Sequence, residues 1–149
     1  MIARIALFVL PLAAVVVAGT VATANPETIA ARKAVMKGVG AETGVGAKMV
    51  KGELPFDLER AKKIFATYTD AAGKMPGLFP DDSKTGGETS AAPKIWEDMA
   101  GFKDHFAKFG ADAKAAGSSV TDLDSFKTTF GAVTRNCGGC HEVYRIKKS

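Results

Sequence analysis

Two series of apolar residues with helical spacing constrain the fold of this chain more than any other feature of its sequence. Steps of three and four residues place side chains on one face of an α-helix. The first series runs through Ile95, Met99, Phe102, Phe106, Phe109 and Ala113, and the second through Leu123, Phe126, Phe130, Val133, Cys137, Cys140 and Tyr144. The spacing predicts two long amphipathic helices. No alternating run indicates a β-sheet.

The second of these helices has a predicted beginning and a short connection before it. Thr121 and Asp124 form a capping-box-like pair at its start. Residues 115–120, with one glycine and two serines, predict a short connection from the preceding helix. Helices joined in this way pack as antiparallel neighbours. Cys137 and Cys140 continue the apolar face, so we expect them on the buried side.

The first half of the chain predicts two more helices. Asp57 is a candidate N-cap for a helix that ends near Gly73 and buries Ala61, Ile64, Phe65 and Tyr68. Residues 27–51 predict a longer helix with apolar positions Ile29, Val35, Met36, Val39 and Val50. Residues 73–93 are rich in Gly, Pro, Asp and Ser and predict a long loop. Four helices with one long connection make an all-α, antiparallel four-helix bundle.

The longer of these two helices is unusually rich in glycine, with Gly38, Gly40, Gly44 and Gly46. Each glycine in a helix costs about 1 kcal/mol relative to alanine. Two interpretations are open. A flat ligand or another helix approaches the backbone closely here, or the helix is an ordinary, loosely packed one.

The beginning of the chain has the features of a secretory signal peptide. Arg4 supplies a positive charge, residues 5–18 are apolar, and Ala22-Thr23-Ala24 is a small-x-small cleavage site. We therefore predict that residues 1–24 are removed and that residues 25–149 form the domain. The rival interpretation is an uncleaved membrane anchor, which needs about 20 apolar residues. No later segment is apolar enough to span a membrane, so we predict an exported, periplasmic protein with no membrane contact after cleavage.

Composition and charge narrow the classes of function. The net charge of +4 comes from acidic and basic residues that alternate along the chain, which indicates no nucleic-acid partner. Two cysteines are too few for a disulfide-rich scaffold. The sequence contains no Ser/His/Asp arrangement, phosphate-binding loop or dinucleotide motif, so we do not predict an enzyme.

The motif that carries chemistry is Cys137-Gly138-Gly139-Cys140-His141, the C-x-x-C-H spacing of covalent c-type haem attachment. On a helix these two thiols and the imidazole share a face, so both thiols can bind the porphyrin edge while the imidazole reaches the iron. One alternative is a thioredoxin-like dithiol, which belongs near a βαβ pattern that is absent here. A zinc site needs a fourth ligand, and His105 is the only other histidine.

The predicted mature chain resembles the cytochrome c′ family, including its low-spin Met/His-ligated relatives. The resemblance covers residues 25–149. The motifs that carry it are the C-terminal C-x-x-C-H followed by Tyr144-Arg145, the Pro93-Lys94-Ile95-Trp96 segment, Arg32 with Met36-Lys37, and the segment 50–57. It implies one haem c per chain, attached through Cys137 and Cys140, with His141 as the proximal iron ligand.

The resemblance also implies further haem contacts. Arg145 lies one turn after His141, where it either tunes the imidazole or belongs to a solvated basic tail. Arg32 matches an arginine near a haem propionate, and Lys33 is its neighbour. Ser90 falls where the family places a polar haem contact, and Thr89 is a second candidate. Phe79, in the long loop, either covers the haem edge or anchors the loop to the core.

Met36 divides the functional hypotheses. In the low-spin relatives the matching methionine is the sixth iron ligand, which suits one-electron transfer between redox partner proteins. In high-spin cytochrome c′ the matching residue blocks the site without binding, and the iron admits NO or CO. A third interpretation is plain core packing. We predict the electron carrier, with gas binding as the alternative, and the resemblance also admits a homodimer.

Overall fold

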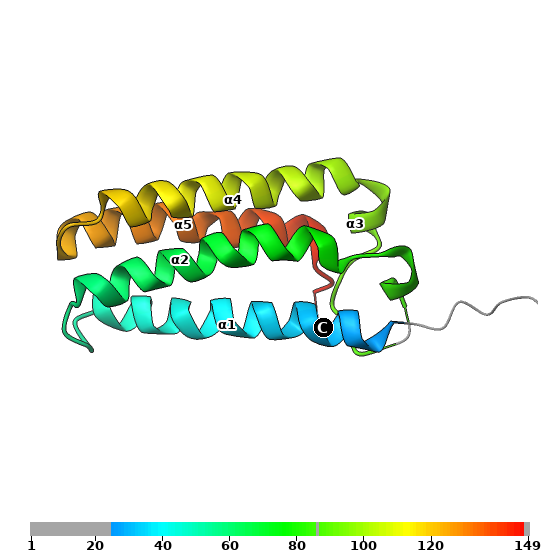
Figure 1. The fold of residues 1–149 in the computed structure, drawn as a ribbon, viewed down its shortest axis with the longest axis horizontal. Coiled ribbons are helices and arrows are strands. Elements are labelled where there is room, and N and C mark those ends of the chain that lie inside the picture. The colour runs from blue at the N-terminus through cyan, green and yellow to red at the C-terminus, as the bar shows by residue number, and fades with distance from the viewer. Residues whose placement is uncertain (1–24, 86, 148–149) are drawn as a thin grey trace, which may run out of the picture.

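The computed structural model describes residues 25–85 and 87–147, and these form a four-helix bundle (Figure 1). The long helices are α1 (Pro26–Val50), α2 (Leu58–Lys74), α4 (Met99–Ser119) and α5 (Leu123–Tyr144). They run alternately in opposite directions. The described part of the chain contains no β-strand, only an isolated antiparallel bridge between Ala91 and Arg145. The all-α prediction is confirmed.

The long connection between α2 and α4 is partly helical. It contains the 3-10 helices η1 (Met75–Leu78) and η2 (Asp81–Ser83) and the short α3 (Lys94–Glu97). These segments close one end of the bundle (Figure 1). No helix between residues 25 and 147 is long and apolar enough to cross a membrane. The predicted signal peptide, residues 1–24, lies outside the described residues.

Side-chain caps fix where the helices begin. Asn25 and Asp57 accept hydrogen bonds from backbone N–H groups in the first turns of α1 and α2, as a side-chain oxygen at an N-cap does. The predicted start of α5 is wrong in detail. Asp122, and not Thr121, is the N-cap, and its capping box is formed with Ser125. The hydroxyl oxygen of Ser125 accepts a hydrogen bond of 3.0 Å from the backbone N–H of Asp122. In the predicted capping box the side chain of Asp124 had this role.

Two other boundaries differ from the sequence-based expectation. The helix predicted from the series that begins at Ile95 is interrupted at Asp98, whose backbone leaves the helical region (φ −136°, ψ 58°) because its side chain caps α4 through Gly101 N–H. The connection predicted at residues 115–120 is shorter than expected, since α4 continues to Ser119. A glycine suits position 117 within this helix because α2 passes close by: a Cβ there would lie 3.3 Å from Cβ of Phe65.

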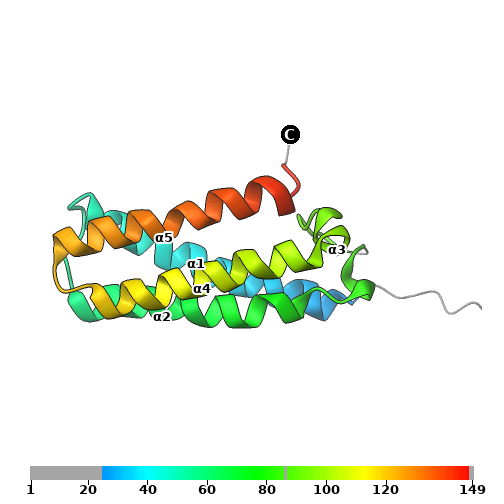
Figure 2. The same cartoon turned by 90° about the horizontal axis from the view of Figure 1, so that it is seen from above.

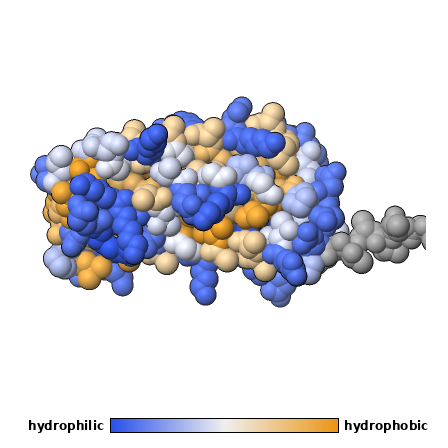
Figure 3. Space-filling model, viewed as in Figure 1, coloured by the Kyte–Doolittle hydropathy of each residue, from blue (hydrophilic) through white to orange (hydrophobic). Residues whose placement is uncertain are grey.

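The core is aromatic and is built mainly where α4 packs against α2 and α5. Tyr68 and Phe102 are fully buried, and the ring contacts of the core are edge-on or tilted at 4.7–6.3 Å between centroids. On the face shown in Figure 3, hydrophobic side chains appear between clusters of hydrophilic ones. Burial of these aromatic residues is the largest source of stability in a bundle of this kind.

One of the four α1 glycines has a packing reason. A Cβ at Gly46 would overlap the ring of Phe130 on α5, so α1 and α5 approach closely at this level. At Gly38, Gly40 and Gly44 a Cβ would meet nothing within 4 Å. Close approach of another helix therefore explains Gly46, and no contact explains the other three.

Candidate functional site

The candidate attachment turn lies near the end of α5. Cys137 and Cys140 are half-buried free thiols, and Cys140 packs against the core. Burial raises the pKa of both thiols, and the neighbouring Cys137 adds to the rise at Cys140. The next residue, His141, lies at the surface. Partial burial and the positive charge of Arg145 lower the pKa of its imidazole, which favours the neutral form that binds a metal.

The C-terminal half of α5 diverges from α4 and α2 (Figure 2). A hollow of about 490 Å³ borders the attachment turn there and is lined by Gly138, His141, Glu142, Arg145, Ile146 and Lys147. The last turns of α5, where the motif lies, are therefore less enclosed by neighbouring helices than its first turns.

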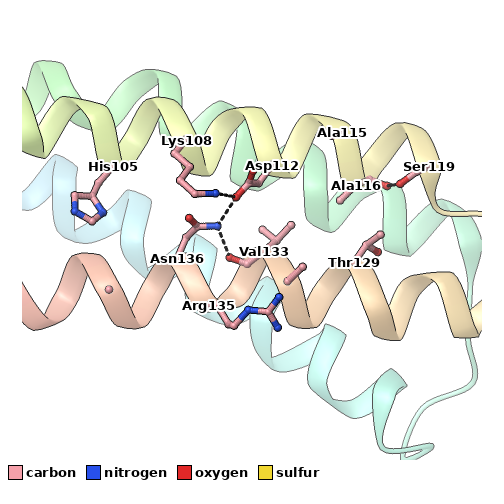
Figure 4. A pocket seen from close by; sticks show the side chains of 12 residues that line it. His105, Lys108, Asp112, Ala115, Ala116, Ser119, Thr129, Val133, Arg135 and Asn136 are labelled. Carbon is pink, nitrogen blue, oxygen red and sulfur yellow. Dashed lines mark hydrogen bonds and ion pairs between the residues drawn. The ribbon is translucent and has the colours of Figure 1, made fainter.

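A second hollow, of about 620 Å³, lies between α4 and α5, and both polar and apolar side chains line it. Figure 4 shows Lys108 and Asp112 of α4 and Asn136 of α5 pointing toward one another across it. Asn136 donates a hydrogen bond of 2.9 Å to Asp112, and Lys108 lies 2.6 Å from the same carboxylate oxygen. These hydrogen bonds lower the pKa of Asp112. Gly139 of the motif lines this groove, whereas neither motif cysteine does.

The helical register places the attachment turn at the same level of the bundle as Met36. Phe130 of α5 packs on Gly46 of α1, and the two helices are antiparallel. Met36 lies ten residues before Gly46, and Cys140 lies ten residues after Phe130. Since both helices rise by about 1.5 Å per residue, Met36 and Cys140 are at the same level of the bundle. Met36 is half-buried and packs against the core.

Arg32, one turn before Met36, is a buried cation without a carboxylate partner among the described residues. Its side chain donates hydrogen bonds to neutral oxygens, namely Leu78 O at 3.3 Å, Ser83 Oγ and O at 3.0 Å each, and Thr89 Oγ1 at 2.8 Å. Burial lowers its pKa. A buried cation is stabilised by a nearby anion, so this environment fits a carboxylate group such as a haem propionate.

The remaining predicted site residues lie around this arginine. The ring of Phe79 lies 4.7 Å from the Arg32 guanidinium and packs edge-on against Phe102, which supports the interpretation as a loop anchor. Lys33 is exposed. Ser90 is half-buried, and its carbonyl accepts a hydrogen bond of 2.8 Å from Ile146 N–H, beside the Ala91–Arg145 bridge. The structure thus brings Arg32, Phe79, Thr89, Ser90 and Arg145 to one end of the bundle.

Sequence reasoning missed three side chains that shape the loop end of the bundle and the groove between α4 and α5. Ser83 is fully buried and bonds to Arg32, but a serine in a polar loop carries no signal of burial. Asn136 bonds to Asp112, and no spacing rule links two helices in this way. Asp98 could have been recognised, because an aspartate before an apolar run is a typical N-cap.

The alternatives to haem fit the residues poorly. The described residues contain no group of three His, Cys, Asp or Glu side chains able to hold a metal ion. The ring of His105 packs edge-on against Tyr144. Two thiols and an imidazole on one helix form the donor set that attachment of haem c requires, and a methionine lies at the same level on α1. This fold and donor set define a c-type cytochrome built on a four-helix bundle.

Comparison with known proteins gives the family. A family model described as Cytochrome C′ matches residues 27–145. The chain is 47% identical over 135 residues to a cytochrome c′ from Rhodopseudomonas palustris, covering 91% of this chain and 92% of that protein. It is 38% identical over 118 residues to a cytochrome c-556 from Agrobacterium tumefaciens, covering 78% and 95%. The chain belongs to the cytochrome c′ family.

Solved structures agree with the sequence comparison. The structure of cytochrome c′ from Rhodopseudomonas palustris superimposes with a TM-score of 0.79 at 49% identity, covering 82% of this chain and 98% of that one. An NMR-validated model of oxidised cytochrome c556 from the same organism gives 0.75 at 27% identity, covering 84% and 100%. The protein is a haem-binding electron-transfer cytochrome that carries one covalently attached haem c.

Proposed function

We propose that the protein is exported to the periplasm after removal of residues 1–24 and carries single electrons between redox partner proteins, without enzymatic activity. Cys137 and Cys140 would hold the haem, and His141 and Met36 would be the ligands of its iron. The observation that carries this proposal is the register of α1 and α5, which sets Met36 level with the attachment turn.

Each residue has a separate task in this proposal. When bound, the haem supplies an iron ion that can accept and release one electron. The buried guanidinium of Arg32 holds a propionate carboxylate, and its half-buried neighbours Thr89 and Ser90 exclude water from that side. The thioether of Met36 is a soft, neutral ligand, which raises the reduction potential in combination with a histidine. The positive charge of Arg145 lies near the imidazole of His141 and disfavours a second positive charge there.

Gas binding is the second candidate, and the 47% identity to a cytochrome c′ favours it. In that case Met36 guards the distal face without binding, and NO or CO enters beside it. The two functions assign opposite roles to the same sulfur atom, so a single substitution separates them.

The experiment compares optical and EPR spectra of the haem-loaded wild type and Met36→Ala, with and without NO. The electron carrier requires a low-spin wild type that becomes high-spin on substitution. Met99→Ala is the matched control, because Met99 is also a half-buried methionine packed against the core. A high-spin wild type that responds to NO would establish gas binding instead. Absence of covalent haem would contradict both functions.

A further inference from the structure

A short segment, residues 89–92, connects the two helices that carry the candidate axial ligands. On one side it meets α1. Arg32 donates a hydrogen bond of 2.8 Å to Thr89 Oγ1, and the same oxygen accepts a bond of 3.1 Å from Ala91 N–H. The threonine hydroxyl therefore joins the α1 side chain to the backbone of the segment.

On its other side the segment pairs with the end of α5. Ala92 N–H donates to Tyr144 O at 3.0 Å, and Ile146 N–H donates to Ser90 O at 2.8 Å. These two bonds flank the antiparallel bridge between Ala91 and Arg145. The backbone that leaves α5 is thus fastened to the segment by backbone hydrogen bonds around a single bridge.

The two attachment points lie next to the candidate ligands. Arg32 is four residues before Met36, and Tyr144 is three residues after His141. These spacings correspond to one helical turn on the same face. Arg32 and Tyr144 are also level with each other in the antiparallel register set by Gly46 and Phe130. The segment therefore bridges α1 and α5 one turn beyond the proposed iron site.

The α1 end of this bridge is held rigidly. Arg32 is 4% exposed and is fixed by Leu78, Ser83 and the ring of Phe79 as well as by Thr89. Ser83 is itself completely buried and donates to Pro80 O at 2.8 Å. A guanidinium with so many partners cannot move without breaking several hydrogen bonds, so the bridge transmits displacement of one helix to the other.

We infer that residues 89–92 set the separation of α1 and α5 at the iron site, and that Thr89 and the backbone N–H of Ile146 are positioning groups for Met36 ligation. This inference rests on the proposed function, because it requires Met36 to be a ligand. Loosening either side of the bridge lets the C-terminal turns of α5, which already diverge from α4, move away from α1 (Figure 2).

Ile146→Pro tests the α5 side in the haem-loaded protein. Proline removes the N–H that bonds to Ser90 O, and Arg145 already has the extended backbone (φ −122°, ψ 132°) that precedes a proline. Ile146→Ala retains the N–H and is the matched control, since the side chain is 48% exposed. We expect Ile146→Pro to convert part of the haem to high-spin and to lower the reduction potential, and Ile146→Ala to leave both as in the wild type.

Thr89→Val tests the α1 side with a second, independent variant. Valine has the shape of threonine without the acceptor oxygen. We expect about tenfold faster exchange of the Ala91 amide hydrogen, as for loss of one hydrogen bond, together with the same spectral change as Ile146→Pro. Thr67→Val is the control, because Thr67 is a half-buried threonine of α2 whose hydroxyl bonds only within its own helix, to Lys63 O.

The outcomes separate this inference from the proposed function. A low-spin wild type in which Ile146→Pro and Thr89→Val both raise the high-spin fraction supports the inference. A low-spin wild type whose spectrum and potential are unchanged in both variants overturns it and leaves the electron carrier intact. An equal change in Ile146→Ala also overturns it. A wild type that is already high-spin overturns both.

Discussion

The hydroxyl of Tyr144, the last residue of α5, donates a hydrogen bond of 2.8 Å to Oδ2 of Asp98, the residue that caps α4. One carboxylate thus begins one helix and fastens the end of another. Burial and the bond to Asp98 raise the pKa of Tyr144 to about 12. The bond from Tyr144 and that from Gly101 N–H lower the pKa of Asp98.

Tyr144→Phe is expected to make the protein more sensitive to acid. The lowered pKa of Asp98 means that its ionised form stabilises the fold above the unfolded value near 3.8, and that this contribution is lost as the pH falls through the folded value. Without the Tyr144 hydroxyl the pKa of Asp98 rises, so acid unfolding begins at higher pH. Circular dichroism during acid titration measures this midpoint. Tyr68→Phe is the control for the general loss of stability when a hydrogen-bonded tyrosine hydroxyl is removed, because that hydroxyl bonds to Thr43 and not to a carboxylate.

Tyr68→Phe should instead change the alkaline limb of the stability curve. Burial raises the pKa of Tyr68 to about 12, from 10 in the unfolded chain. The neutral phenol therefore stabilises the fold fully below about pH 10 and progressively less toward about pH 12. Loss of the hydrogen bond to Thr43 lowers the free energy of unfolding of the variant by about 1 kcal/mol at neutral pH. Between about pH 10 and about pH 12 the urea midpoint of the variant falls less steeply than that of the wild type. Identical alkaline slopes in variant and wild type would contradict the assignment.

Alanine substitutions at Gly44 and Gly46 of α1 should change the free energy of unfolding in opposite directions. Gly46→Ala places a methyl group in the ring of Phe130, so we expect a loss of about 1–3 kcal/mol from overpacking. Gly44→Ala meets nothing within 4 Å and gains up to about 1 kcal/mol of helix propensity. Urea denaturation of both variants measures the difference. Equal effects would show that α1 and α5 do not touch at this level.

Arg32→Met should destabilise the loop end of the bundle. The variant loses the hydrogen bonds to Ser83 and Thr89 and leaves Ser83 Oγ with only its bond to Pro80 O, a cost of about 3 kcal/mol. Hydrogen exchange should be fastest in residues 78–92. The exposed Arg135→Met serves as the control. Retained protection of this segment in Arg32→Met would exclude Arg32 as its anchor.

Local signals in the sequence were sufficient for the helices and for the attachment motif. The three-and-four spacing from Leu123 to Tyr144 reports one buried face, and C-x-x-C-H fixes its chemistry in five residues. The surroundings of Arg32 could not be predicted, because its partners lie 46 to 57 residues away in a loop without periodicity. The continuation of α4 through Gly117 could not be predicted from the sequence either, because the close approach of Phe65 of α2 to this glycine is a contact between distant residues.

Both ends of the described chain are tied to the same loop. Asn25 N–H bonds to Asp82 O at 3.0 Å, and Ile146 N–H bonds to Ser90 O. The turn that joins α1 to α2 contains Gly52, the one described residue with a positive φ. A circular permutant that joins α5 to α1 and is opened at this turn should therefore keep every helix in place. In its chain order the haem-attachment motif comes before α1 instead of after it.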